Sequence, residues 1–178
     1  MTMNQPDLGL SSPLDWTTKS LVFGSDHAGF ETKEFLRIYL QSQGAQVRDM
    51  GCYSPESVDY PQVARALASA VVEHSEGLLG LLLCGSGNGV CISANRIPGA
   101  RAALCWLPEL AALARSHNNA NILCLPVPTV SKAVPSGSNQ TNVTPVQDFH
   151  RLNKAIAHLT QEILFGDSAI LKDHFGGL

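Results

Sequence analysis

Side chains that could support chemistry stand at three places in the sequence where a predicted element of secondary structure ends. Two of these places follow apolar runs, and the third closes a helical pattern. The chemistry open to them is that of a reactive thiolate, an oxyanion site or a metal site, and each has a structural alternative. The residues are Asp26-His27, Cys84 with the glycine-rich run after it, and His117-Asn118.

The run Cys84-Gly-Ser-Gly-Asn-Gly89 has several interpretations. No Lys-Ser/Thr pair follows the glycines, as a Walker phosphate loop would require. The glycine spacing also differs from that of a dinucleotide fingerprint, and the next strand ends at Cys105-Trp106 without an acid for a ribose hydroxyl. Backbone N–H groups at a helix start, with the Ser86 hydroxyl, could instead stabilise an enolate-like charge. A purely structural glycine turn is the alternative.

The cysteines also have two interpretations. Cys84 stands just before a predicted helix, where the helix dipole favours a thiolate. From its position alone, a buried and unreactive cysteine is the preferred interpretation of Cys84. The same interpretation is favoured more strongly for Cys91, Cys105 and Cys124, each of which lies inside an apolar element.

The remaining candidates have structural alternatives as well. Asp26-His27 could cap a helix, Tyr60 could pack at a helix start, and His117-Asn118 could end a helix. A metal site formed by Asp26, His27, Cys84 and His117 would lack the i,i+4 ligand spacing of helical zinc sites, so no metal is predicted.

Composition narrows the class of protein. The chain has 178 residues, 44% of them hydrophobic and 15% charged, which suits a compact soluble domain. A net charge of −3 disfavours nucleic acid and anionic membranes as partners. The five cysteines show no C-x-x-C spacing, and neither a secretory signal nor a membrane-spanning run is visible. We therefore expect a cytoplasmic protein.

Strands and helices alternate along the sequence with short connections. This order predicts a doubly wound α/β fold, in which a five-stranded parallel sheet lies between two layers of helices. Residues 1–18 are expected to be a flexible extension and residues 19–178 a single domain, with a long polar loop at 126–147 and an amphipathic helix at 148–165. Strands are predicted at 20–24, 45–50, 78–83, 101–105 and 121–125, and helices at 30–43, 61–73, 108–117 and, as a short segment, after residue 89.

The predicted fold places the candidates at two edges of the sheet. Asp26 and Cys84 follow strands and so belong at the carboxyl edge, where open α/β sheets bind ligands. His117 and Asn118 precede a strand and so belong near the opposite edge. If all serve one reaction, a second subunit must supply the histidine.

In order and spacing, four segments together resemble the ribose-5-phosphate isomerase B and galactose-6-phosphate isomerase family. The resemblance covers about residues 20–125 and implies a Rossmann-like subunit, no metal and no cofactor. It also implies a homodimer or homotetramer with active sites shared between subunits. The segments are Gly24-Ser-Asp-His-Ala-Gly-Phe30, Asp59-Tyr-Pro61, Cys84-Gly-Ser-Gly-Asn-Gly89 with Ala94-Asn-Arg96, and Ala114-Arg-Ser-His-Asn-Asn-Ala120.

The same resemblance implies the catalytic roles. Cys84 corresponds to the base that moves a proton between C1 and C2 of the open-chain sugar, and His117 to the residue that opens the furanose ring. Ser86 belongs to the loop that holds the enediolate. The other residues of this loop are Gly85, Gly87, Asn88 and Gly89.

Substrate-binding roles follow from the resemblance in the same way. Asn118 and Asp26 correspond to ligands of sugar hydroxyls, and Tyr60 to a residue lining the sugar. His27 and Arg115 correspond to part of the phosphate site.

The C-terminal part departs from the family pattern. Pro126–Gln147 replaces a short Gly-Arg turn, and no arginine follows Arg151 where the family has phosphate-binding arginines. We expect an aldose–ketose isomerase acting on a sugar phosphate, with ribose 5-phosphate and ribulose 5-phosphate as its substrates. The alternatives are a hexose phosphate or other sugar, or a catalytically weak paralogue that binds sugar phosphates.

Overall fold

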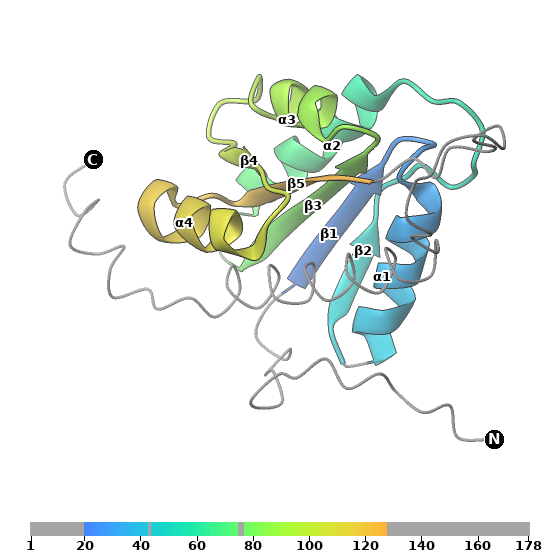
Figure 1. The fold of residues 1–178 in the computed structure, drawn as a ribbon, viewed down its shortest axis with the longest axis horizontal. Helices are drawn as coiled ribbons and strands as arrows, with labels where there is room; N and C mark the ends of the chain where they lie inside the picture. The colour runs from blue at the N-terminus through green and yellow to red at the C-terminus, as the bar shows by residue number, and fades with distance from the viewer. Residues whose placement is uncertain (1–19, 43, 75–76, 128–178) are drawn as a thin grey trace, which may run out of the picture.

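A computed structural model describes residues 20–42, 44–74 and 77–127. Its strands form one parallel sheet in the order β2-β1-β3-β5-β4, with helices on both faces (Figure 1). The predicted Rossmann-like doubly wound fold with three layers is therefore confirmed. The strands are β1 (Ser20–Ser25), β2 (Gln46–Asp49), β3 (Leu78–Cys84), β4 (Ala102–Leu104) and β5 (Ile122–Pro126), and the helices are α1 (Phe30–Ser42), α2 (Tyr60–Glu73), α3 (Asn88–Ala94) and α4 (Pro108–Asn118).

Each predicted strand is present, and most boundaries agree to within one or two residues. The predicted strand at 101–105 is shorter than expected, because only Ala102–Leu104 pair with β5. The predicted extension at 1–18 and the helix at 148–165 lie outside the described residues, as does the polar loop from residue 128 onward.

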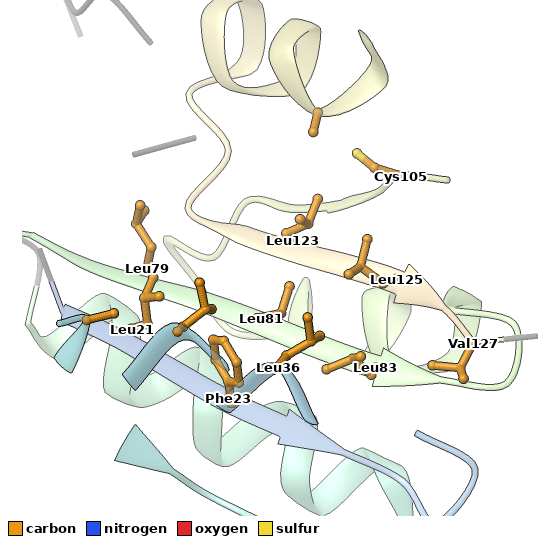
Figure 2. Close-up of a cluster of buried hydrophobic side chains, with 13 residues drawn as sticks. Leu21, Phe23, Leu36, Leu79, Leu81, Leu83, Cys105, Leu123, Leu125 and Val127 are labelled. Carbon is orange, nitrogen blue, oxygen red and sulfur yellow. The ribbon is translucent and has the colours of Figure 1, made fainter. Parts of the chain in front are cut away.

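The two faces of the sheet carry separate cores. On one face, side chains of β1, β3 and β5 pack against α1 and α4, and Figure 2 shows Phe23, Leu36 and Leu81 within this cluster. On the other face, alternate residues of the same strands, such as Val22 and Leu82, pack against α2 and α3. Burial on both faces explains why β3 has an unbroken apolar sequence rather than an alternating one.

The point where the winding of the sheet reverses lies between β1 and β3. These neighbouring strands pair in parallel from Ser20↔Leu78 to Ser25↔Leu83. The chain leaves β1 for α1 on one face and leaves β3 for α3 on the other. In open α/β sheets, ligands bind in the crevice that such a reversal creates at the carboxyl ends of the strands.

Within the described part of the chain, no helix has both the length and the apolar character needed to cross a membrane.

Candidate active site

The carboxyl ends of β1 and β3 bring two of the predicted site residues to the reversal point. Asp26 follows the last residue of β1, and its backbone N–H donates to the carbonyl of Leu83 at 3.1 Å. Cys84 is the next residue after Leu83 and ends β3. The main-chain pairing therefore fixes Asp26 beside Cys84, although 58 positions separate them in the sequence.

Hydrogen bonds fix both the backbone and the side chain of Cys84. The thiol is buried, with 4% of the residue exposed, and Sγ accepts a hydrogen bond of 3.0 Å from the backbone N–H of Gly87. The Cys84 carbonyl accepts a second bond, of 2.9 Å, from the N–H of Val127. These two bonds fix the position of the sulfur atom at the start of the glycine-rich loop.

The conformation of the loop after Cys84 depends on Gly87. This residue caps α3 with φ of 72°, in the left-handed region that favours glycine. A Cβ atom there would stand 2.4 Å from Leu104 Cδ1 and 3.0 Å from the backbone nitrogen of Pro126. Glycine at this position therefore lets the loop turn back tightly enough to aim its own N–H at Cys84.

The polar residues of the same loop face solvent. Ser86 and Asn88 are both exposed, and the N–H of Asn88 donates to Ser86 Oγ at 3.3 Å. Gly85, between Cys84 and Ser86, is partly buried. The loop thus presents a hydroxyl and a carboxamide at the surface beside the buried thiol.

Tyr60 joins this group from α2. Its ring covers the start of α3 so closely that a Cβ on Gly89 would lie 2.8 Å from Tyr60 Cε2 and Cζ. The tyrosine is 39% exposed, so it lines the surface of the site and is not a core residue. The structure therefore places Tyr60 beside the glycine-rich loop.

Asp26 is oriented by a glycine that the sequence analysis did not assign to the site. Oδ1 of Asp26 accepts a 2.9 Å bond from the N–H of Gly29, and a Cβ on Gly29 would lie 2.7 Å from the Leu83 carbonyl oxygen. The Asp-x-x-Gly spacing was the available signal, because aspartate commonly bonds nearby main-chain N–H groups. His27 is exposed at the same turn.

The remaining predicted residues lie elsewhere. His117 and Asn118 are exposed at the end of α4, which leads into the amino end of β5. Arg115, on the last turn of α4, donates from Nη1 to Asn119 Oδ1 at 2.7 Å and to the Ala120 carbonyl at 3.1 Å. Within one chain these three residues therefore lie at the opposite edge of the sheet from Cys84. The predicted topology had placed His117 and Asn118 at that edge.

The other cysteines of the core have distinct environments. Burial raises the pKa of Cys105 to about 11, and the hydrogen bond with Cys91 raises that of Cys124 well above its usual value. Both residues are buried, which confirms the core interpretation for them. Cys91 is only partly buried, and its bond with Cys124 lowers its pKa to about 7.

Two cavities open at the amino edge of the sheet, opposite Cys84. One, of about 580 Å³, lies beside the starts of β1 and β2 and is lined in part by Gln46 and His74. The other, of about 330 Å³, lies near the starts of β3 and β5 and is lined by Arg101 and Arg115 among others. Among the described residues, no three His, Cys, Asp or Glu side chains gather as metal ligands would.

Known proteins share both the sequence and the fold. Residues 21–143 match the family model described as Ribose/Galactose Isomerase. Ribose-5-phosphate isomerase B of Mycolicibacterium paratuberculosis is 48% identical over 101 residues, which are 56% of this chain and 63% of that relative's length. A probable ribose-5-phosphate isomerase B of Mycoplasma genitalium is 37% identical over 135 residues, covering 75% of this chain and 84% of the relative.

Solved structures give the same result. A crystal structure of ribose 5-phosphate isomerase from Thermotoga maritima superposes with a TM-score of 0.65 at 38% identity, covering 83% of this chain and 86% of the other. Ribose-5-phosphate isomerase B of Mycoplasma genitalium with bound ribulose-5-phosphate superposes with a TM-score of 0.65 at 31% identity, covering 83% and 84%. Sequence, fold and the residues gathered at the carboxyl edge agree, and the chain belongs to the ribose/galactose isomerase family.

Proposed function

We propose that this protein interconverts an aldose phosphate and a ketose phosphate, with ribose 5-phosphate and ribulose 5-phosphate as the substrate pair. The observation that carries the proposal is the position of the Cys84 thiol, which accepts a hydrogen bond from the N–H of Gly87. This thiol lies where the winding of the sheet reverses, in a chain that matches the Ribose/Galactose Isomerase family. The bound ribulose-5-phosphate in the Mycoplasma genitalium structure supports the choice of a pentose phosphate.

The proposed reaction moves one proton between two carbons. The Cys84 thiolate removes the proton from C2 of the open-chain aldose, and the electrons of that C–H bond form a C1–C2 double bond while the C1 oxygen becomes an oxyanion. The O2 proton passes to the C1 oxyanion, and the thiol returns its proton to C1 while the C2–O2 double bond of the ketose forms. The N–H groups and hydroxyl of the loop at 85–89 stabilise the enediolate between these steps.

Other residues of the same edge bind and orient the sugar in this proposal. Asp26, whose carboxylate is fixed by Gly29, accepts a hydrogen bond from a sugar hydroxyl, and Tyr60 lines one wall. His117 and Asn118 act on the site of a neighbouring copy, where the histidine opens the furanose ring. The active unit is accordingly a homodimer or a larger homo-oligomer.

The proposal is tested by measuring isomerisation of purified protein on a panel of pentose 5-phosphates and hexose 6-phosphates. We expect the highest kcat/KM on ribose 5-phosphate. The family description includes galactose isomerases, so hexose phosphates are the matched alternative in the same assay. Binding of these sugars without turnover of any would contradict the proposed reaction and favour a sugar-phosphate-binding paralogue.

A further inference from the structure

Two arginines face the same cavity at the amino edge of the sheet. Arg101 directly precedes β4, and Arg115 lies on the last turn of α4. Both line the cavity of about 330 Å³, together with Asn119 and Asn121. Arg101 is exposed and Arg115 is partly buried.

Neither arginine has an acidic partner in the described part of the chain. The ion pairs found there all involve Lys33 or Arg37, and none of the described residues that line the cavity is acidic. Burial and the nearby charge of Arg101 both lower the pKa of Arg115, as expected for two cations held close together. Two positive charges that lie close together without a counterion repel each other, so an anion between the two guanidinium groups would be stabilised.

Hydrogen bonds to neutral groups already orient both guanidinium groups. Arg101 donates from Nε to the Asn119 carbonyl at 2.6 Å and from Nη1 to the Gly99 carbonyl at 3.1 Å. Arg115 donates from Nη1 to Asn119 Oδ1 and to the Ala120 carbonyl. The two planar groups are thus positioned around one residue, Asn119, before any ligand arrives.

Donors remain after these bonds are counted. Arg115 Nε is buried and has no hydrogen-bond partner among the described residues. Buried donors are rarely left unpaired in native proteins, and one without a partner needs an explanation. A purely structural role, in which both arginines bind carbonyl groups at the end of α4, explains the observed bonds but not this orphan donor or the uncompensated pair of charges.

We propose that this cavity binds a tetrahedral oxyanion of the phosphate type between Arg101 and Arg115. Arginine groups match phosphate geometry because their N–H donors are arranged in a planar fork. The anion has two sources, free inorganic phosphate or the phosphoryl group of a sugar phosphate. The second source rests on the proposed function, since His117, two residues after Arg115, is then part of a neighbouring copy's site.

The test measures binding of inorganic phosphate by calorimetry at constant ionic strength, so it requires no turnover. We expect Arg101→Gln to weaken phosphate binding about tenfold or more, because one charged donor group is lost. Arg101→Lys, which keeps the charge without the fork, should have an intermediate effect. Arg65→Gln, at an exposed arginine of α2, is the matched control and should bind phosphate like the wild type.

Two further measurements distinguish the sources. If phosphate still binds to protein saturated with sugar phosphate, and this binding depends on Arg101, the cavity takes the free anion. If sugar phosphate displaces inorganic phosphate, and Arg101→Gln raises KM with little change in kcat, the cavity takes the substrate's phosphoryl group. Unchanged phosphate affinity and unchanged KM in Arg101→Gln and Arg101→Lys would overturn the proposal and leave the pair with a structural role.

Discussion

The two edges of the sheet differ in both packing and charge. At the carboxyl edge, glycines allow main chain and side chains to approach closely, and the thiol of Cys84 is already hydrogen-bonded. At the amino edge there are cavities and the guanidinium groups of Arg101 and Arg115, which have no acidic partner among the described residues.

The difference indicates a division of roles between the edges. In the proposed reaction the carboxyl edge supplies the groups for proton transfer, and the structure fixes Cys84 and Asp26 there by hydrogen bonds. The amino edge presents cations and the exposed His117, which can serve a ligand or a neighbouring copy. Under the proposed function, a single chain therefore has the groups for one reaction at two places that it does not itself bring together.

The largest effect is expected from removing the thiol at the carboxyl edge. Cys84→Ala should lower kcat by about 10³-fold or more, because a methyl group cannot transfer a proton. Substrate binding, measured by calorimetry, should change little. Cys105→Ala is the matched control, since it removes another buried thiol but from the opposite core, and turnover near the wild-type level is expected. Near-normal turnover in Cys84→Ala would remove this thiol from the mechanism.

Mixing two inactive variants tests whether the edges combine between copies. Cys84→Ala and His117→Ala chains should each be inactive alone. After subunit exchange in equal amounts, activity should return to about one quarter of the wild-type level, because half of the dimers are mixed and each mixed dimer has one intact site. Heterodimers shown by mass spectrometry but lacking activity would contradict a shared site.

A pair of glycine substitutions compares packing at the two edges. Gly87 and Gly44 both have positive φ, but only Gly87 has atoms within 4 Å of an added Cβ. Gly44→Ala should therefore lower the free energy of unfolding by about 1 kcal/mol through backbone strain. Gly87→Ala should lower it by about 1–3 kcal/mol more, because Leu104 and the backbone of Pro126 must move. Denaturant unfolding measures both, and equal losses would show that the carboxyl edge relaxes freely.

The smallest effect is expected on the stability of the fold in acid, through Glu34 on α1. A hydrogen bond with Arg37, and to a smaller extent one with Lys33, lowers the pKa of Glu34 from its usual value of 4.5 to about 2. A carboxylate with a lowered pKa stabilises the folded state above its unfolded pKa, and this contribution is lost as the pH falls from about 4.5 to about 2.

Glu34→Gln should accordingly lower stability at neutral pH and flatten its dependence on pH in that window. The effect should be small and weaken with added salt, because Glu34 and Arg37 are at the surface. Glu56→Gln, at an exposed carboxylate of the loop after β2, is the control and should keep the wild-type slope. Identical slopes for both variants in acid unfolding experiments would contradict this role of Glu34.

The fold could be predicted from the sequence because its signals are local. The unbroken apolar run of β3 indicates a strand buried on both faces, and alternation with helices then implies a parallel sheet. The predicted order of strands and helices also placed Cys84 and Asp26 at one edge and His117 at the other. These inferences need only the order of elements, since the carboxyl ends of parallel strands share an edge.

Only the tertiary structure decided the contacts that depend on main-chain geometry and on distant neighbours. The N–H of Gly87 points at Cys84 because Leu104 and Pro126, far along the chain, leave room only for glycine. Arg101 and Arg115 belong to different elements, and neither has a motif that indicates the other. They face one cavity because β4 pairs with β5 and α4 leads into the start of β5. Hydrophobic periodicity does not specify which charged side chains such an arrangement brings together.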